Sequence, residues 1–326
     1  MLYFCTLFDS NYLSRGLTMY KSLAEHCPSF HLYIFPFDER TSRVLKRLSL
    51  PHVTLVPLSE FESEDLLRVK PTRTRAEYCW TSTSSAILHV LEQYHVDLCT
   101  YVDADLFFYD NPSILIDEMQ GKSVMITEHR YNPRYDLSAW SGIYCVQFIS
   151  FRNDERGMKA LRWWRDRCIE WCYDREEDGK FGDQKYLDDW PGRFQGVQVL
   201  RHRGGGVAGW NVQLVRAQNA NGNIRCTNSS TGTEFSMVFY HFHFVRFYTN
   251  GLIDLGDYSI SQNARDVFYK PYLRQLEKSK ERIRSVDDTF DPHGPREFPR
   301  SWEGFINRMK RRARGRYSVY PFKELL

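Results

Sequence analysis

The sequence predicts an α/β fold in which helices flank a mainly parallel central sheet. Three observations support this fold class. Apolar segments of strand length alternate with amphipathic segments of helix length over the first half of the chain. Strands that are connected by helices pair in parallel and leave the helices on both faces of the sheet. With 326 residues the chain is also long enough to bury a large core.

The first half of the chain gives the clearest elements. In the segment 12–26, for example, Leu13, Leu17 and Tyr20 recur at helical spacing. Ligands of such sheets bind at the carboxyl ends of the strands, so these ends are where we expect a site. The predicted elements are, in order, strand 2–8, helix 12–26, strand 30–37, helix 39–49, strand 52–58, helix 81–94 and strand 98–103.

The second half is predicted to hold a long amphipathic helix over 154–172. The strands expected around this helix are 123–129, 143–151, 196–202 and 235–244. From about residue 255 the sequence becomes helical and charged. We therefore predict a main domain over 1–254 and a helical C-terminal extension with a basic tail over 255–326.

Composition narrows the class of protein. The net charge of +3 is too small to favour nucleic-acid binding. The eight cysteines show no Cys-x-x-Cys, so we expect mostly buried, reduced thiols rather than zinc ligands or disulfides. Residues 1–13 carry no basic leader and no segment approaches the length of a membrane span, which predicts a cytoplasmic protein. The abundant aromatic residues suit cores, and also surfaces that bind bases or sugars.

Asp103 and Asp105 follow the predicted strand 98–103. Carboxylates two residues apart at a strand end can face one cation. Hard divalent ions such as Mg²⁺ and Mn²⁺ take oxygen ligands and keep room for a phosphate. The pair therefore predicts a metal that bridges to a diphosphate, although such a pair can also serve only to open a turn.

Polar residues follow two further predicted strands. Asp9 and Asn11 could hydrogen-bond a base or a ribose, or Asp9 could cap the next helix. His241 and His243 are expected on one face of the strand 235–244, and Arg246 lies just beyond them. Imidazoles and an arginine together favour a metal–phosphate site over two isolated core histidines.

Two loops also draw attention. Asp183 and Gln184 precede a helical turn, where an aspartate is usually a cap. The glycines at 204–206 are costly in conformational entropy, which indicates a sharp bend or a close approach of the backbone to another group. Trp210 and Asn211 beside them could stack on and hydrogen-bond a sugar, or belong to a plain flexible loop.

Over residues 1–250 the chain resembles nucleotide-sugar glycosyltransferases of the GT-A fold, a Rossmann-like fold with a mainly parallel sheet. The most similar groups are the retaining enzymes related to glycogenin, the bacterial lipooligosaccharide galactosyltransferases, and glycosyltransferases of bacterial polysaccharide gene clusters. The motifs that carry the resemblance are, in sequence order, "FDSNYL" (8–13), "YVDADLFF" (101–108), "YCVQFISF" (144–151) followed by a helix, "GDQKYL" (182–187) and "YHFHF" (240–244).

The resemblance implies a transferase, of hexosyl type, that uses a nucleotide-sugar donor. In this family the first strand–helix turn contacts the uracil and ribose of a UDP-sugar, which implies Asp9, Asn11 and the backbone near Leu7. A basic residue ahead of the Asp-x-Asp strand also contacts the donor. The candidates for that residue in this chain are Lys70, Arg73 and Arg75.

The resemblance also implies the metal ligands. Asp103 and Asp105, with Ala104 between them, would hold Mn²⁺ or Mg²⁺ on the diphosphate of the donor. A late histidine supplies the third ligand in the family. His241 fits that place best, and His243 remains an alternative.

The chain departs from the family at two places. Phe244 stands where the late motif has a glycine, and the diphosphate-binding lysine has no match, so Arg246 is the substitute. The family's Asp-Gln pair beside the donor sugar matches Asp183 and Gln184, which favours a retaining reaction. An inverting reaction with Asp183 as the base is the alternative.

The implied acceptor is a hydroxyl of a saccharide or of a lipid-linked oligosaccharide. The tail 308–316 carries six basic residues and is flanked by Trp302, Phe305 and Ile306. We expect the segment 302–316 to contact the anionic inner face of the plasma membrane, unless it is only a solvated face. Two other classes stay open: a metal-dependent phosphohydrolase, whose site can also begin with Asp-x-Asp, and a non-catalytic sugar-nucleotide-binding protein.

Overall fold

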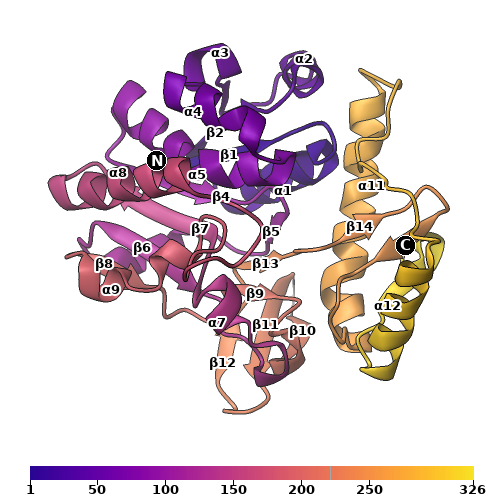
Figure 1. The fold of residues 1–326 in the computed structure, drawn as a ribbon. Coiled ribbons are helices and arrows are strands. Elements are labelled where there is room, and N and C mark those ends of the chain that lie inside the picture. Colours follow the sequence, from indigo (N-terminus) through magenta and orange to yellow (C-terminus); the bar gives the residue numbers. More distant parts are fainter. Residues whose placement is uncertain (221) are drawn as a thin grey trace.

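The computed structural model describes residues 1–220 and 222–326, and it confirms the predicted fold class. A seven-stranded sheet with the order β3-β2-β1-β4-β7-β6-β8 forms the centre of the molecule (Figure 1). Strand β7 runs antiparallel to both neighbours, and the other pairings are parallel. The strands are β1 (Leu2–Phe8), β2 (Phe30–Pro36), β3 (Val53–Leu55), β4 (Leu98–Val102), β6 (Val124–Glu128), β7 (Tyr144–Arg152) and β8 (Val197–Val199).

Helices cover both faces of this sheet, because successive side chains of a strand point to opposite faces. In β1, Cys5 and Leu7 pack beneath α5 and α8, whereas Phe4 and Phe8 pack beneath α1 and α2. The longer helices of this part are α1 (Leu13–His26), α2 (Glu39–Leu48), α5 (Arg75–Gln93) and α8 (Glu155–Glu170). The shorter helices include α3 (Leu58–Phe61), α4 (Glu64–Val69), α6 (Ser113–Ile116), α7 (Ser138–Ser141) and α9 (Trp190–Arg193).

Two small sheets complete the main body below the central sheet. In the first, β13 (Phe239–His241) lies between β5 (Leu106–Phe108) and β9 (Val207–Ala208). The second is an antiparallel sheet of β10 (Val215–Ala220), β11 (Asn223–Asn228) and β12 (Glu234–Ser236). The single strand predicted over 235–244 is therefore wrong in extent, because β13 ends at His241 and His243 lies beyond it.

The glycine run at 204–206 is explained by close packing. A Cβ at Gly204 would collide with the carbonyl oxygen of Ser236, and a Cβ at Gly205 would lie 2.8 Å from the side chain of Leu115. The backbone therefore approaches its neighbours more closely than any other residue type would allow. All cysteines except the half-buried Cys79 are buried, which confirms the prediction that they are mostly core residues.

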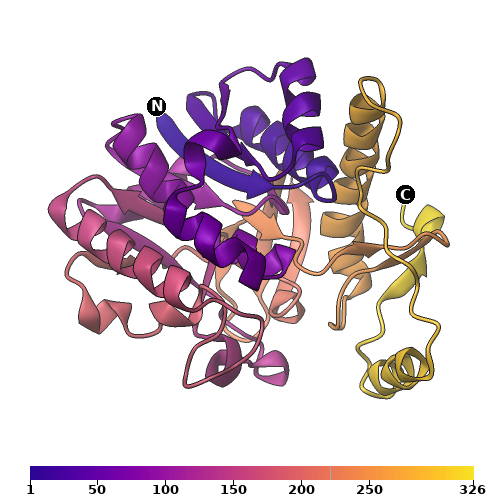
Figure 2. The same ribbon diagram turned by 45° about the horizontal axis from the view of Figure 1, so that its top comes forward.

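The C-terminal part stands beside the main body, in orange and yellow (Figures 1 and 2). Besides the expected helices it contains an unexpected sheet, which joins strands from both sides of the predicted boundary at 254/255. The boundary itself stays a prediction. Among the described residues, no helix is both long and apolar enough to cross a membrane. The elements of this part are β14 (Arg246–Phe247), β15 (Leu252–Asp254), α10 (Gln262–Ala264), α11 (Lys270–Arg284), α12 (Trp302–Ala313) and β16 (Val319–Pro321).

Candidate active site

The Asp-x-Asp pair lies in a short turn between two strands. Strand β4 ends at Val102, and the turn is fixed by the bond from Asp103 N to the carbonyl oxygen of Gln147, at 3.0 Å. Strand β5 follows directly and pairs antiparallel with β13, which sets Leu106 opposite His241. The pairing of β5 with β13 therefore brings a histidine from late in the chain next to the turn.

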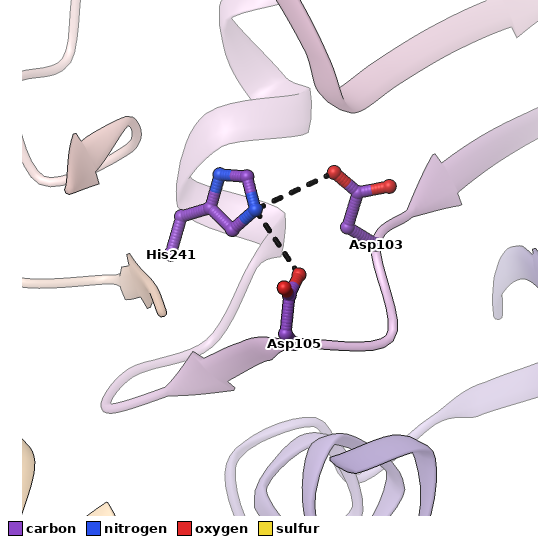
Figure 3. A group of neighbouring side chains, drawn as sticks. All are labelled: Asp103, Asp105 and His241. Atoms are coloured by element: carbon purple, nitrogen blue, oxygen red, sulfur yellow. Dashed lines mark ion pairs between the residues drawn. The ribbon is translucent and has the colours of Figure 1, made fainter. Parts of the chain in front are cut away.

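The side chains of Asp103, Asp105 and His241 converge (Figure 3). Nε2 of His241 lies 3.0 Å from Oδ1 of Asp105 and 3.6 Å from Oδ2 of Asp103. One ligand atom from each of the three residues falls within 4.8 Å of the other two, and no other group of His, Cys, Asp or Glu in the described part of the chain does so. Two carboxylates and an imidazole fit a divalent ion such as Mn²⁺.

The charges in this cluster show why a cation fits it. Burial raises the pKa of Asp103, the positive charge of His241 opposes this increase and the negative charge of Asp105 adds to it, so that the pKa is about 6. Burial alone would lower the pKa of His241, but the carboxylate of Asp105 raises it well above its ordinary range. The two carboxylates therefore favour a positive charge between them, which a divalent ion would supply more effectively than a proton.

His243 lies outside this group. Its ring centre is 5.4 Å from that of His241, and burial lowers its pKa to about 3. The geometry thus favours His241 over His243 as a partner of the carboxylates, while the ligand role of either residue stays a prediction. Arg246 follows in β14, with its guanidinium 4.4 Å from the centre of the Phe244 ring.

The turn that holds Asp9 and Asn11 lies at the same edge of the central sheet. Strand β1 pairs with β4 so that Cys5 is opposite Tyr101, which sets Leu7 level with Asp103. The carboxylate of Asp9 accepts a hydrogen bond from Asn11 N at 2.8 Å. The carboxyl ends of two neighbouring parallel strands therefore bring the two predicted ligand segments together.

One of the three candidate basic residues lies at this turn. Nε of Arg75 is 2.5 Å from Oδ2 of Asp9. Lys70 instead pairs with Glu62 at 2.6 Å, and Arg73 stacks on a tyrosine ring. Arg75, at the start of α5, is thus the candidate whose position agrees with a donor contact, and the contact itself stays a prediction.

Asp183 and Gln184 directly precede the short helix Lys185–Leu187. The carbonyl oxygen of Asp183 accepts a hydrogen bond from Nε1 of Trp164 at 2.8 Å, and the amide of Gln184 donates to Ser141 O at 2.7 Å. Burial raises the pKa of the Asp183 carboxyl to about 8, and the negative charge of Asp103 adds to the increase. The Asp183 carboxyl is therefore close enough for the charge of Asp103 to act on it. Near pH 7 its neutral form is favoured.

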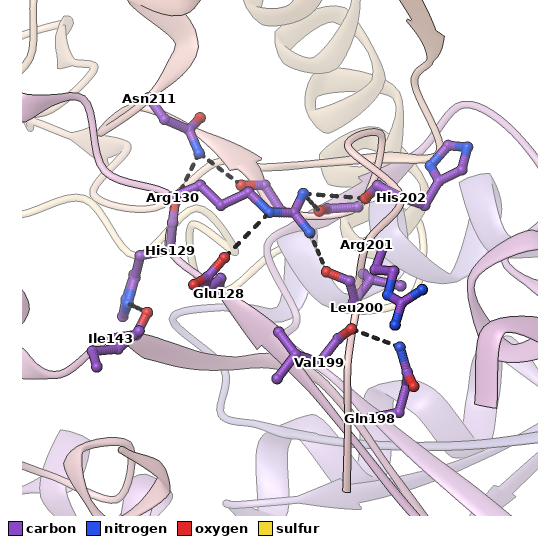
Figure 4. Close-up of polar contacts among 12 residues, drawn as sticks. Glu128, His129, Arg130, Ile143, Gln198, Val199, Leu200, Arg201, His202 and Asn211 are labelled. Atoms are coloured by element: carbon purple, nitrogen blue, oxygen red, sulfur yellow. Dashed lines mark hydrogen bonds and ion pairs between the residues drawn. The ribbon is translucent and has the colours of Figure 1, made fainter. Parts of the chain in front are cut away.

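Trp210 and Asn211 are buried, and their polar groups bind the protein itself. Figure 4 shows the contact of the Asn211 amide with the backbone of His129. Nε1 of Trp210 donates to the carbonyl oxygen of His129 at 2.7 Å, and Nδ2 of Asn211 donates to the same oxygen at 2.8 Å. The Trp210 ring packs edge-on against His241, 5.4 Å away. These contacts support the position of His241, whereas the predicted contact of Trp210 and Asn211 with a sugar stays a prediction.

Comparisons with known proteins identify a family and a fold. No family model matches the chain. It is 30% identical over 311 residues to the uncharacterized protein YfnD of Bacillus subtilis (strain 168), covering 93% of this chain and 94% of YfnD. The chain belongs to the YfnD family. YfnF of the same organism is 33% identical over 247 residues, which cover 73% of this chain and 80% of YfnF.

The solved structures that resemble this YfnD-family protein have the GT-A fold. The galactosyltransferase LgtC in complex with donor and acceptor sugar analogs matches with a TM-score of 0.54 at 9% identity, covering 85% of this chain and 96% of LgtC. An active-site mutant of LgtC matches with a TM-score of 0.53 at 10% identity and the same coverage. At such low identity the likeness shows the fold alone, and it confirms the predicted GT-A fold.

Arg15 is a buried residue near the Asp9 turn that no sequence pattern singles out. From α1 its guanidinium donates to the carbonyl oxygens of Asn11 at 3.1 Å, His293 at 3.0 Å and Val245 at 2.9 Å. It thereby ties the Asp9 turn both to the segment that follows His241 and to the C-terminal part. A single arginine on a helix carries no signal of such a role, because its partners are backbone atoms far apart in the sequence.

Proposed function

We propose that this YfnD-family protein is a metal-dependent glycosyltransferase. It would move a sugar from a nucleotide diphosphate sugar, a UDP-sugar in the first instance, to a hydroxyl of a saccharide or lipid-linked saccharide. The observation that carries the proposal is the cluster of Asp103, Asp105 and His241 at the carboxyl edge of a GT-A sheet. LgtC, which shares this fold, was solved with donor and acceptor sugar analogs.

Each group of site residues has its own role in the proposed reaction. Asp103, Asp105 and His241 would hold Mn²⁺ or Mg²⁺ next to the diphosphate. The bound ion would neutralise the charge that develops on the leaving diphosphate and act as a Lewis acid. Asp9 and Asn11 would orient the nucleoside at the adjoining turn.

The properties of Asp183 and Gln184 support a reaction that retains the anomeric configuration. The amide of Gln184 is held by Ser141 O and would line the donor face, with a phosphate oxygen of the donor taking the acceptor proton. The raised pKa of Asp183, about 8, keeps most of its carboxyl protonated near pH 7, so that only a minor part is in the ionised form that a base requires. Inversion with Asp183 as the base is the alternative, and the anomeric configuration of the product distinguishes the two.

Thermal denaturation with a panel of nucleotide sugars tests the proposal. A UDP-sugar with Mn²⁺ should raise the melting temperature by several degrees, because a ligand that binds the native state stabilises it by about 2.7 kcal/mol at a hundredfold excess over Kd. The variant Asp105→Asn should lose the part of the shift that depends on Mn²⁺. The matched control Asp166→Asn changes an exposed carboxylate of α8 and should keep the full shift.

Three results would contradict this proposal. One is the absence of any shift with the whole panel in the presence of Mn²⁺. Another is phosphate release from generic phosphate esters, which would favour the phosphohydrolase. The third is binding of a nucleotide sugar with neither transfer nor hydrolysis of its sugar in the presence of any acceptor tested, which would favour a non-catalytic binding protein.

We further propose that α12 contacts an anionic membrane. This helix buries none of its side chains, and Trp302, Phe305 and Met309 form an exposed apolar stripe at intervals of three and four residues. The rings of Trp302 and Phe305 stack at 5.5 Å. The basic residues of 308–316 flank the stripe, and such a combination suits a surface of anionic lipid on the inner face of a membrane.

Flotation with phosphatidylglycerol vesicles tests this contact. Deleting the tail would also remove β16, which pairs with β15, so point substitutions are preferable. The double variant Trp302→Ser, Phe305→Ser should lose flotation at unchanged stability, because it removes most of the apolar stripe. Trp140→Ser, at a tryptophan of α7 that is 52% exposed, is the control and should float as the wild type does. Equal flotation of the double variant and the wild type would overturn the proposal.

A further inference from the structure

A segment of the C-terminal part, residues 291–298, runs back across the main domain and touches the turn that holds Asp9 and Asn11. Gly294 has a φ of +60°, and a Cβ at this position would lie 2.6 Å from both Cβ and O of Asn11. Ser14 N donates to the carbonyl oxygen of Pro292 at 3.2 Å. The segment is thus packed directly on the proposed nucleoside-binding turn, and the bond from Arg15 to His293 O holds it there.

The same segment pairs with the chain just after His241. Arg296 N donates to Phe247 O at 2.9 Å, and Thr249 N donates to Arg296 O at 3.1 Å, which forms a parallel bridge between Arg296 and Tyr248. Residues that face each other across such a bridge point to the same side, as do residues two apart in a strand. The side chains of Arg246, Tyr248 and Arg296 therefore share one side.

Both arginines are available to bind an anion. Within residues 1–220 and 222–326, neither Arg246 nor Arg296 forms an ion pair with a carboxylate, whereas Arg311 nearby is taken up by Asp254 at 2.6 Å. Arg296 is exposed and Arg246 is half-buried against the Phe244 ring. Two guanidinium groups on one side of paired segments, without acidic partners, form a concentrated positive charge.

This positive charge lies near the metal cluster. The hydroxyl of Tyr12, the residue after Asn11, is subject to the charges of both. Desolvation raises the pKa of Tyr12, the negative charge of Asp105 also raises it, and the positive charges of Arg296 and Arg246 lower it. Tyr12 is therefore close enough to Arg246, Arg296 and Asp105 for all three charges to act on its hydroxyl.

We infer that Arg296 joins Arg246 in binding the phosphate groups of the nucleotide donor, so that the C-terminal part completes a site otherwise built by the main domain. The inference rests on the proposed function. A guanidinium matches phosphate oxygens with two parallel hydrogen bonds, and two such groups can supply the charge that a single lysine supplies elsewhere. The phosphate of an anionic lipid is the other source of the same chemistry.

Calorimetry with UDP and Mn²⁺ tests the inference. Arg296→Gln should raise the Kd for UDP about tenfold, because a charged contact to phosphate is lost, and Arg296→Lys should cost less. Arg300→Gln, at an exposed arginine four residues further along, is the matched control and should leave Kd unchanged. All three variants should melt as the wild type does, since the side chains of Arg296 and Arg300 have no partner to lose among the described residues.

The arms of the experiment separate the possible failures. Wild-type protein that does not bind UDP with Mn²⁺ contradicts the proposed function and this inference with it. Wild type that binds, together with an Arg296→Gln variant that binds equally well, overturns the inference alone. Equal weakening of uridine and UDP would indicate a structural role and overturn it too. A variant that loses only flotation with phosphatidylglycerol vesicles would assign Arg296 to lipid and overturn the nucleotide contact.

Discussion

At the scale of single residues, Phe244 shows how backbone conformation marks the candidate site. Its φ of +67° lies in the left-handed region, which a bulky L-residue seldom adopts. The resembled family has a glycine at this place, for which the conformation is free of strain. In this chain Phe244 is 41% exposed, and the guanidinium of Arg246 packs over its ring. We infer that the contact with Arg246 offsets the cost of the conformation.

Comparing Phe244→Gly with Phe244→Ala separates the strain from the ring. Both variants lose the ring, but only alanine keeps the Cβ that the left-handed conformation disfavours. The alanine variant should therefore be less stable than the glycine variant by about 1 kcal/mol, measured as the free energy of unfolding in urea. Alanine and glycine variants of equal stability would show that the backbone at 244 is unstrained in solution.

The carboxylate pair of the Asp103, Asp105 and His241 cluster could be predicted from the sequence because its pattern is local. Asp103 and Asp105 follow an apolar strand, and the pattern needs no knowledge of the rest of the fold. The choice between His241 and His243 could not be made, because apolar residues alternate on to Phe244 although the backbone pairing ends at His241. Alternation reports which side chains are buried, not how far the ladder of hydrogen bonds extends.

At the scale of elements, α5 begins earlier than predicted, because a capping box in the sequence marks its start less clearly than the later run of threonine and serine. The helix was predicted from residue 81, where threonine and serine are frequent, but it begins at Arg75. Thr74 and Glu77 form a capping box, in which Thr74 N donates to Oε2 of Glu77 at 2.7 Å. The earlier start is what sets Arg75 beside Asp9.

The elements that the sequence did not predict are short strands with distant partners. Strands β14 and β16 have two and three residues, and β15 joins them across more than sixty positions of sequence. Runs of this length fall below what periodicity can recognise. The antiparallel direction of β7 was also beyond the sequence, because the connection from β6 to β7 contains only one-turn helices and allows either direction.

At the scale of the whole molecule, the two parts of the chain are joined through buried polar contacts as well as apolar ones. Helix α11 packs against α1, where Oγ1 of Thr18 and Oγ of Ser279 are 2.8 Å apart. His293 reaches Oγ of Ser14 at 2.8 Å through Nδ1 and Oε1 of Glu277 at 2.6 Å through Nε2. The C-terminal part therefore closes over α1, which begins immediately after the Asp9 turn.

Arg15 contributes to this interface as a buried cation that donates to three backbone carbonyls. In Arg15→Lys a single ammonium replaces a planar fork, so it cannot reach carbonyls that lie in different directions. We expect the free energy of unfolding to fall by about 2 kcal/mol, the usual cost of a lost hydrogen bond to a charged group. Amide exchange at Arg296 and Thr249 should accelerate, since the bonds from Arg296 N to Phe247 O and from Thr249 N to Arg296 O join the same segments.

The matched control for this prediction is Arg43→Lys, which keeps the charge of an exposed arginine that pairs with Asp287 of the C-terminal part at 3.6 Å. The lysine keeps the positive charge opposite Asp287, and an ion pair at the surface contributes about 0–1 kcal/mol, so the control should unfold as the wild type does. If Arg15→Lys also unfolded as the wild type and exchanged no faster at Arg296, the carbonyl contacts would not hold the segment 291–298. Its contact with the Asp9 turn would then depend on the packing of Gly294 alone.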